Sequence, residues 1–230
     1  MFQRTLTIIV LGVSCSNAQP SSTAINTFEH KQLGIRFKYE PDIDPPDGLL
    51  KPDISNWKRF HVETLGVSFL LPQNTKVAEF PGDSLDHAPQ RLAMVFQSGV
   101  RVEFFISSSP FETIVTEYGI KRQTHSTNQD QWVYTSGMGG EVLYRLDGLI
   151  WKGFRCYSSF EVSGDDGFHG VSDHIFCVLI RPISTNMNAV FYFDTTAGSE
   201  QIQRSPYPFT ETEFYELVSS FEQISNGNHR

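Results

Sequence analysis

The sequence predicts an α+β fold in which a mostly antiparallel sheet of about seven to eight strands is covered by two helices. Three observations support this prediction. Apolar and polar residues alternate in several short segments, which is typical of half-buried strands. Turn signals such as Ser98-Gly99 and Asp147-Gly148 separate neighbouring apolar runs. Two further segments combine helix-capping residues with apolar residues at helical spacing.

The alternating segments give the expected order of strands. They are residues 33–39, 60–71, 91–97, 100–107, 132–135, 141–146, 149–160, 174–181 and 188–194. The two turn signals join 91–97 to 100–107 and 141–146 to 149–160 as hairpins. We expect 174–181 to pair with the other side of 149–160, which makes a long hairpin between Trp151 and Pro182.

Each expected helix has its own start signal. Ser109 is a capping residue followed by Pro at the first helical position and by Glu112 three residues later. Gly119 stands where a left-handed C-terminal cap would end this helix. The second helix starts at a capping box formed by Thr210 and Glu213. Both helices have one apolar stripe, as helices that cover a sheet require.

The chain is expected to contain one folded domain. Its hydrophobic content of 39% suffices for one sizeable core at this length. We assign residues 57–230 to this α+β domain and residues 19–56 to a polar leader, rich in Pro and Asp, with one strand. Residues 1–18 resemble a secretory signal peptide, because Arg4 precedes an apolar run and small residues end at Ala18.

Two processing routes are compatible with this N-terminal pattern. Cleavage after Ala18 would release a soluble protein that starts at Gln19. Alternatively, Gly-Val-Ser-Cys15 resembles a lipobox, and Cys15 would carry a lipid anchor. Both routes predict export, most simply to the periplasm or cell envelope of a bacterium. The apolar run is too short to cross a bilayer, so we expect membrane attachment only through that anchor.

The long hairpin contains the other two cysteines, Cys156 and Cys177. Because exported proteins meet an oxidising environment, the sequence predicts a disulfide between the two strands. Closing a loop of about twenty residues would stabilise the fold by about 3 kcal/mol. A reactive thiol and a metal-binding pair are the alternatives. Neither cysteine has a CxxC partner or an adjacent activating base, which disfavours both alternatives.

The loop that connects the two strands of this hairpin, residues 163–173, is polar and glycine-rich. Together with His174 it contains several side chains that could bind a metal ion. These are Asp165, Asp166, His169, Asp173 and His174. A solvated loop is the simplest interpretation, and a metal site is an alternative. The side chains of two consecutive residues in an extended chain point to opposite sides, so positions 173 and 174 would serve one ion poorly. Since exposed loops on a rigid hairpin often carry recognition, we take 163–173 as the first candidate contact surface.

No catalytic motif stands out in the sequence. It has no Gly-x-Ser-x-Gly, HExxH, P-loop or GxGxxG pattern. We therefore interpret His61, His87 and His125 as solvated or hydrogen-bonded residues and expect no cofactor. A hydrolase without a local motif remains an alternative. The formal net charge of −8 disfavours nucleic acid as a partner, because phosphates require a basic surface.

Five aromatic residues on neighbouring expected strands allow two interpretations. They are Trp132, Tyr134, Tyr144, Trp151 and Tyr157. Core packing is the simpler interpretation. If some of these rings face outward, they would form a platform that binds a protein or a sugar.

The order of elements resembles the PsbP-like fold. The resemblance rests on Leu-Gly-Val-Ser-Phe-Leu-Leu-Pro at 65–72, a helix after the first hairpin, and Phe-Tyr-Glu-Leu-Val-Ser-Ser-Phe at 214–221. It covers most of residues 60–224 and implies an α/β/α sandwich that binds proteins or assists assembly without catalysis.

Taken with the export signal and the acidic charge, the sequence predicts a secreted or envelope-located, non-enzymatic protein-binding module. Two variants of this prediction are an immunity-type inhibitor of a secreted toxin and a lipid-anchored assembly factor.

Overall fold

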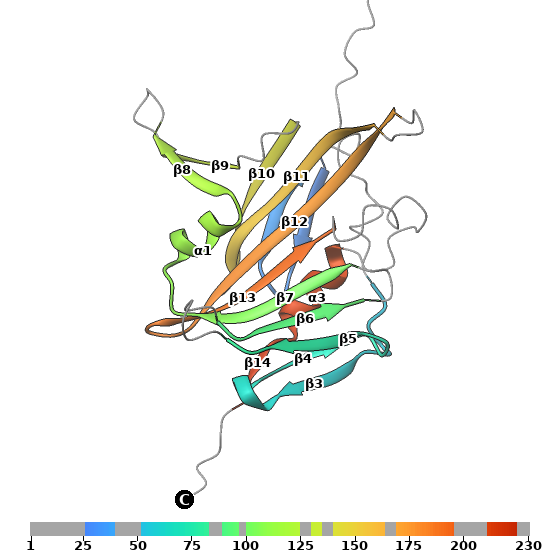
Figure 1. The fold of residues 1–230 in the computed structure, drawn as a ribbon, viewed down its shortest axis with the longest axis vertical. Helices are drawn as coiled ribbons and strands as arrows, with labels where there is room; N and C mark the ends of the chain where they lie inside the picture. Colours follow the sequence, from blue (N-terminus) through green and yellow to red (C-terminus); the bar gives the residue numbers. More distant parts are fainter. Residues whose placement is uncertain are drawn as a thin grey trace, which may run out of the picture.

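A seven-stranded antiparallel sheet forms the centre of the protein (Figure 1). The computed structural model describes residues 26–39, 52–82, 89–96, 100–124, 130–134, 140–163, 169–195 and 211–224. Within these residues the sheet has the strand order β10-β11-β12-β13-β7-β6-β5. Its strands are β5 (Lys76–Phe80), β6 (Arg91–Val95), β7 (Arg101–Ser107), β10 (Gly140–Asp147), β11 (Lys152–Ser163), β12 (His169–Ser184) and β13 (Met187–Asp194).

One face of this sheet is covered by the helix α3 (Glu211–Ser219), a two-stranded hairpin and a small three-stranded sheet. The hairpin consists of β1 (Asn26–His30) and β2 (Ile35–Tyr39). The small sheet has the order β14-β4-β3, with β3 (Lys58–Val62), β4 (Val67–Leu71) and β14 (Glu222–Gln223). Large aromatic side chains from all these parts meet in one core, including Phe69, Phe104, Phe191 and Phe214.

The opposite face is covered by α1 (Phe111–Glu117) and the hairpin of β8 (Ile120–Thr124) and β9 (Asp130–Tyr134). Their apolar residues Ile114, Val115 and Ile120 are buried against residues of β11, β12 and β13. The described part of the chain therefore has three layers, with the large sheet in the middle (Figure 1).

The predicted fold class is confirmed, because the sheet is antiparallel and carries α1 and α3. The turn signals placed both hairpins correctly: β6 pairs with β7, and β10 pairs with β11. β12 pairs with the other side of β11, as expected, but it is 16 residues long and includes half of the predicted loop.

Other segments differ from the prediction. The single strand expected over 60–71 is a hairpin of β3 and β4, because Gly66 adopts a left-handed φ of +62° that favours glycine. The leader contains β1, whose Phe28 is buried in the main core opposite Phe37 of β2. The polar connection after α1 contains β8, and β5 and β14 were not predicted.

The start of α1 also differs from the prediction. Ser109 does not cap the helix. Pro110 is the N-cap residue and makes no side-chain capping hydrogen bond. Gly119 has the expected left-handed conformation, with a φ of +76°. Thr210, the predicted cap of α3, lies outside the described residues.

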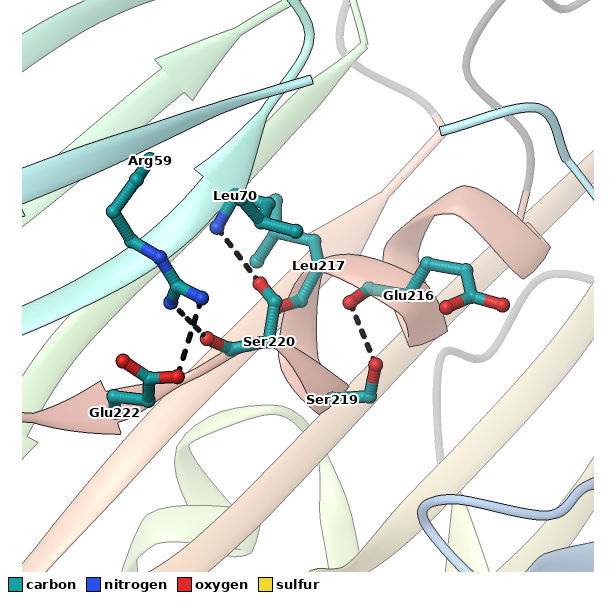
Figure 2. A network of polar contacts seen from close by, with 7 residues as sticks. All are labelled: Arg59, Leu70, Glu216, Leu217, Ser219, Ser220 and Glu222. Atoms are coloured by element: carbon teal, nitrogen blue, oxygen red, sulfur yellow. Dashed lines mark hydrogen bonds and ion pairs between the residues drawn. The ribbon is translucent and has the colours of Figure 1, made fainter. Parts of the chain in front are cut away.

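The end of α3 is fastened to the small sheet by polar contacts (Figure 2). Ser220 Oγ accepts a hydrogen bond from Leu70 N at 2.8 Å and donates one to Leu217 O at 2.7 Å. Arg59 donates to Ser220 O at 2.6 Å and to Glu222 Oε1 at 3.2 Å. Because carbonyls at a helix C-terminus lack partners within the helix and carry partial negative charge, these donors stabilise the end of α3.

Replacing Ser220 with alanine is expected to destabilise the fold by about 1–3 kcal/mol, because the half-buried Leu70 N–H loses its acceptor. Ser219→Ala is the matched control, since Ser219 Oγ donates to Glu216 O in its own helix and its loss should change stability by about 0.5 kcal/mol or less. Urea unfolding measures both changes. Equal effects of the two substitutions would contradict the role given to Ser220.

Candidate functional site

The two cysteines of the long hairpin are not joined by a disulfide. The register of β11 and β12 pairs Cys156 with Phe176, and Cys177 with Arg155. Side chains alternate between the faces of a strand, so this offset of one residue places the two thiols on opposite faces of the sheet. Cys156 is buried on the α1 side and Cys177 on the α3 side. The predicted bridge is therefore wrong, because the β-sheet backbone separates the two side chains.

Burial also makes the Cys177 thiol unreactive. Its pKa is raised by desolvation first and by the nearby Glu211 carboxylate second. A thiol with a raised pKa carries little thiolate at neutral pH, and the thiolate is the reactive form.

With Cys15 replaced by serine, the native protein is therefore expected to react negligibly with Ellman's reagent. After unfolding without reductant, both remaining cysteines should react, because no bridge has to be reduced first. An unfolded, unreduced chain without reactive thiols would show that the disulfide forms after all.

The ligand-rich residues of the predicted loop are only partly described. Asp165 and Asp166 lie outside the described residues, as does Cys15, the candidate lipidation site. His169, Asp173 and His174 belong to β12. Their backbone register pairs them with Ser163, Ser159 and Ser158 of β11. Among the described residues, no three His, Cys, Asp or Glu side chains come together as a metal site.

The last part of this hairpin extends past the neighbouring strands. Pairing of β11 with β10 ends at Ser159, and pairing of β12 with β13 ends at Phe176. Beyond these points, residues 160–163 still pair with residues 169–172. In the described part of the chain, neither segment pairs with any other strand. We call these residues the β11–β12 arm. Figure 1 shows it as the yellow and orange ribbons that run beyond β13.

The sequence around the arm is strongly acidic. Residues 157–180 contain four carboxylates, Glu161, Asp165, Asp166 and Asp173, and no Lys or Arg, so their formal charge is −4. The whole chain has a formal charge of −8. The carboxylates of this hairpin thus lie towards the arm, whereas its basic residues, Lys152, Arg155 and Arg181, lie towards the other end.

The candidate aromatic platform is part of the core. Trp151 and Tyr157 are buried. Trp132 and Tyr134 are half-buried and pack against the core on the α1 side, and Tyr144 packs against the core on the α3 side. Core packing, the simpler interpretation, is confirmed for these rings.

His61 is exposed on β3, whereas His87 and His125 lie outside the described residues.

A buried polar cluster joins α3 to the sheet. Arg155 Nε donates to Glu211 Oε1 at 2.6 Å, and both side chains are almost fully buried, with exposed fractions of 1% and 2%. Tyr215 Oη donates to the same Glu211 oxygen at 2.6 Å. Cys177 Sγ lies 4.0 Å from Tyr215 Oη. The ion pair, the phenol and the thiol thus lie together beneath the first turn of α3.

The same arginine also contacts the β1–β2 hairpin. Its guanidinium lies 4.9 Å from the centre of the Phe37 ring and 5.2 Å from that of Tyr144. Such cation–π contacts are strongest when water is excluded. His30 of β1 adds a further link, because its Nε2 lies 3.6 Å from Glu216 Oε1 of α3. Arg155 therefore connects β11, α3 and β2.

The chemistry of this cluster indicates a structural role. Burial raises the pKa of Tyr215, with the neighbouring Cys177 and Glu211 as smaller causes, so its phenol stays neutral and donates to Glu211. Cys177 stays a thiol for the same main reason. Neither group can act as a nucleophile or base at neutral pH while it is held in this form. The cluster fastens α3 and the hairpin to the sheet.

Sequence reasoning did not find this cluster, although one signal was present. Arg155 lies between Phe154 and Cys156 in a strand that is apolar on both faces. A charged residue in such a strand requires a buried partner. Glu211 gave no comparable signal, because acidic residues are common in the first turn of any helix.

Within the described residues, no helix has the length and apolar composition that crossing a bilayer requires.

No protein-family description and no curated protein matches the chain. Several solved structures resemble it, and two of them are described here. The Ran-binding protein Mog1p of Saccharomyces cerevisiae has 10% identity and a TM-score of 0.40, over 74% of this chain and 96% of that chain. The PsbP protein CyanoP of Synechocystis sp. PCC 6803 has 13% identity and a TM-score of 0.33, over 74% of this chain and 94% of that chain. The PsbP-like resemblance thus has a weak structural counterpart, and neither likeness indicates what this chain does.

Proposed function

We propose that the chain is an exported, non-enzymatic protein-binding module and that the β11–β12 arm is its main contact surface. The observation that supports this proposal is the length of β11 and β12, which run past every strand that flanks them in the described part of the chain.

A two-stranded ribbon is only marginally stable in water. Within the described residues the outer edges of the arm pair with no other strand. The backbone N–H and C=O groups of such edges favour pairing with another extended chain. A partner that covers the arm or adds a strand to it would satisfy these groups. These properties support the proposal that the arm is a contact surface for a partner.

Charge indicates the kind of partner. Residues 157–180 have a formal charge of −4 and contain no Lys or Arg. Complementary charge accelerates association and selects among partners, and its effect weakens as salt rises. We therefore propose a partner with a basic surface. An immunity-type inhibitor is the special case in which that partner is a secreted toxin.

The location is part of the proposal. The basic residue, apolar run and small residues of positions 1–18 support export. Cleavage after Ala18 and lipidation of Cys15 are distinguished by labelling cells with a fatty-acid probe. Label on the wild-type protein that disappears in Cys15→Ser supports the anchor, and an unlabelled protein supports cleavage.

Shortening the arm tests the contact surface. Residues 160–172 are replaced by Asn-Gly, which forms a tight hairpin turn between the paired Ser159 and Asp173. The control replaces Thr185-Asn186, the turn at the other end of β12, by the same dipeptide. Both variants should keep a cooperative thermal transition, because the arm pairs with no other strand in the described part of the chain.

Tagged proteins are then purified from the cell envelope of the producing organism, and their bound proteins are quantified by mass spectrometry. We expect a basic protein that is recovered with the wild type and the control variant, is lost with the shortened arm, and is released by high salt. Recovery with the shortened arm equal to that with the wild type, or no specific protein with either, would refute the proposal.

A further inference from the structure

Two consecutive aliphatic side chains are exposed in the turn between β10 and β11. Leu149 is 77% exposed and Ile150 is 51% exposed, whereas the next residue, Trp151, is buried. A single exposed leucine is common on protein surfaces. Two adjacent ones at the end of a hairpin form a continuous apolar protrusion, and continuous apolar surface marks sites that bind proteins or membranes.

This turn is held against the turn between β1 and β2. Leu149 N donates a hydrogen bond to Leu33 O at 2.9 Å. Gly34 has a φ of +67°, and a Cβ atom there would lie only 2.7 Å from Leu149 Cγ, so the leucine side chain rests directly on this glycine. We call residues 31–34 and 147–151 together the double-turn tip. Because its backbone is already fixed, the tip loses little conformational entropy when it binds.

Basic side chains surround the apolar residues of the tip. Lys31 lies in the first turn and Lys152 directly follows the second, and both are exposed. Arg145 precedes the second turn and bonds Asp147 at 2.8 Å. Three cationic side chains and one carboxylate give this region a formal charge of +2, on a chain whose total is −8.

The acidic part of the hairpin lies at the other end of β11. This strand begins at Lys152 and ends at Ser163 in the arm. Glu161 follows Lys152 by nine positions, which is about 30 Å along a strand and several times the Debye length of about 8 Å at physiological salt. Glu29 of β1, close to the first turn, is paired in the backbone register with Arg36. The carboxylates of the arm therefore hardly weaken the positive potential at the tip.

We propose that the double-turn tip inserts into the surface of a membrane that contains anionic lipids. Leu149 and Ile150 enter the boundary between headgroups and acyl chains, and Lys31 and Lys152 bind the anionic headgroups. Lysine suits this position, because its apolar stem lies along the acyl chains while its ammonium group stays in water. The contact is additional to any lipid anchor at Cys15. It does not depend on the function proposed for the arm, which lies at the opposite end of β11.

The composition of the tip fits a lipid surface better than a protein surface. The residues that dominate binding energy in protein interfaces are enriched in Trp, Tyr and Arg, and leucine is under-represented among them. Lysine is depleted in such interfaces. A stable protein interface also takes about 20–30 residues from each side, whereas the tip offers two apolar side chains. A bilayer has no fixed shape to match, so a small convex tip is sufficient.

Vesicle co-sedimentation of the full-length Cys15→Ser protein tests this contact. The vesicles consist of phosphatidylglycerol mixed with phosphatidylcholine, or of phosphatidylcholine alone. The Cys15→Ser substitution removes the candidate anchor, and all variants share one N-terminus, so residues 1–18 contribute equally to each. We expect the anionic vesicles to bind at least about tenfold more tightly than the neutral ones, because each lysine at an anionic surface contributes about fivefold. Salt should reduce this difference.

Three variants locate the binding. Leu149→Ser/Ile150→Ser should weaken binding to both kinds of vesicle at least about tenfold, because the apolar surface that enters the bilayer is lost. Lys31→Gln/Lys152→Gln should weaken binding about tenfold to anionic vesicles only. Phe80→Ser is the matched control, since Phe80 is 49% exposed on the opposite edge of the large sheet, and it should change binding by less than about twofold. The shortened arm should bind like the wild type.

A fluorophore at the tip reports insertion directly. Leu149→Cys in the Cys15→Ser protein is labelled with nitrobenzoxadiazole, and the two remaining cysteines, Cys156 and Cys177, are buried and do not compete for the label. Its emission should shift to shorter wavelength with anionic vesicles, because the fluorophore leaves water. The same label on Phe80→Cys should show no shift.

Thermal unfolding checks that the variants are folded. If Leu149→Ser/Ile150→Ser does not fold, Leu149→Ser alone takes its place, because Leu149 is the more exposed of the two, and it should weaken binding about fivefold.

Four results would overturn the proposal. They are equal vesicle binding by the tip variant and the wild type, equal weakening by Phe80→Ser, an unshifted emission from the label at position 149, and dimers in sedimentation that the tip variant dissociates. The last result would assign the tip to a second copy of this chain. Absent vesicle binding, together with a co-purified protein that the tip variant loses, would assign it to a protein partner and equally refute the membrane contact.

Discussion

Replacing Arg155 with methionine is expected to lower the free energy of unfolding by about 3–5 kcal/mol, the usual effect of removing one partner of a buried ion pair. The substitution leaves the Glu211 carboxylate without its cation at a site where both side chains are almost fully buried. It also removes the guanidinium that packs against Phe37 and Tyr144. The loss should loosen α3 and the β1–β2 hairpin together.

Urea unfolding with two further variants isolates the pair. Arg155→Met/Glu211→Leu should recover much of the lost stability, because no uncompensated charge remains in the core. Arg145→Met is the control, since Arg145 is 49% exposed and bonds the exposed Asp147, and it should change stability by about 0.5 kcal/mol or less. An effect of Arg155→Met as small as that of Arg145→Met would contradict the role of the cluster.

Gly153→Ala is expected to destabilise the protein by about 3 kcal/mol or more, at the upper end of the effects of overpacking. Gly153 is buried in β11, and a Cβ atom there would lie only 1.8 Å from Val178 O of the paired strand. A backbone carbonyl cannot rotate away as a side chain can, so the central β11–β12 pair would have to shift. Thermal and urea unfolding measure this loss.

Gly66→Ala provides the comparison. Gly66 has a φ of +62°, but the nearest atom to an added Cβ is Ile224 O at 3.9 Å. Only backbone strain is added there, about 1–2 kcal/mol. If Gly153→Ala is no more harmful than Gly66→Ala, the close approach of β11 and β12 at this position is not as described.

Local signals predicted a large part of the fold. The Asp147-Gly148 turn and the alternation around it identified the pairing of β10 with β11, because both depend on residues close in sequence. The apolar stripe of α3 was correct for the same reason, since Phe214, Leu217 and Val218 are all buried. The β1 and β8 strands were missed because their short, polar sequences form strands only through a partner strand.

The candidate sites depended on information that the sequence lacks. A disulfide between Cys156 and Cys177 failed on a register offset of one residue, which no spacing along the chain reveals. The polar loop 163–173 was recognised from composition, but the projection of the hairpin past β10 and β13 follows from the lengths and registers of four strands, β10 to β13.

Site-specific photo-crosslinking in living cells tests the binding role of the arm most directly. A benzoylphenylalanine is introduced at Glu161 or Val171, which are paired in the backbone register of the arm, and at Thr185 in the turn at the other end of β12. We expect a discrete adduct with another protein from both arm positions and none from position 185. No adduct from either arm position, or the same adducts from position 185, would contradict the proposal that the arm binds a partner.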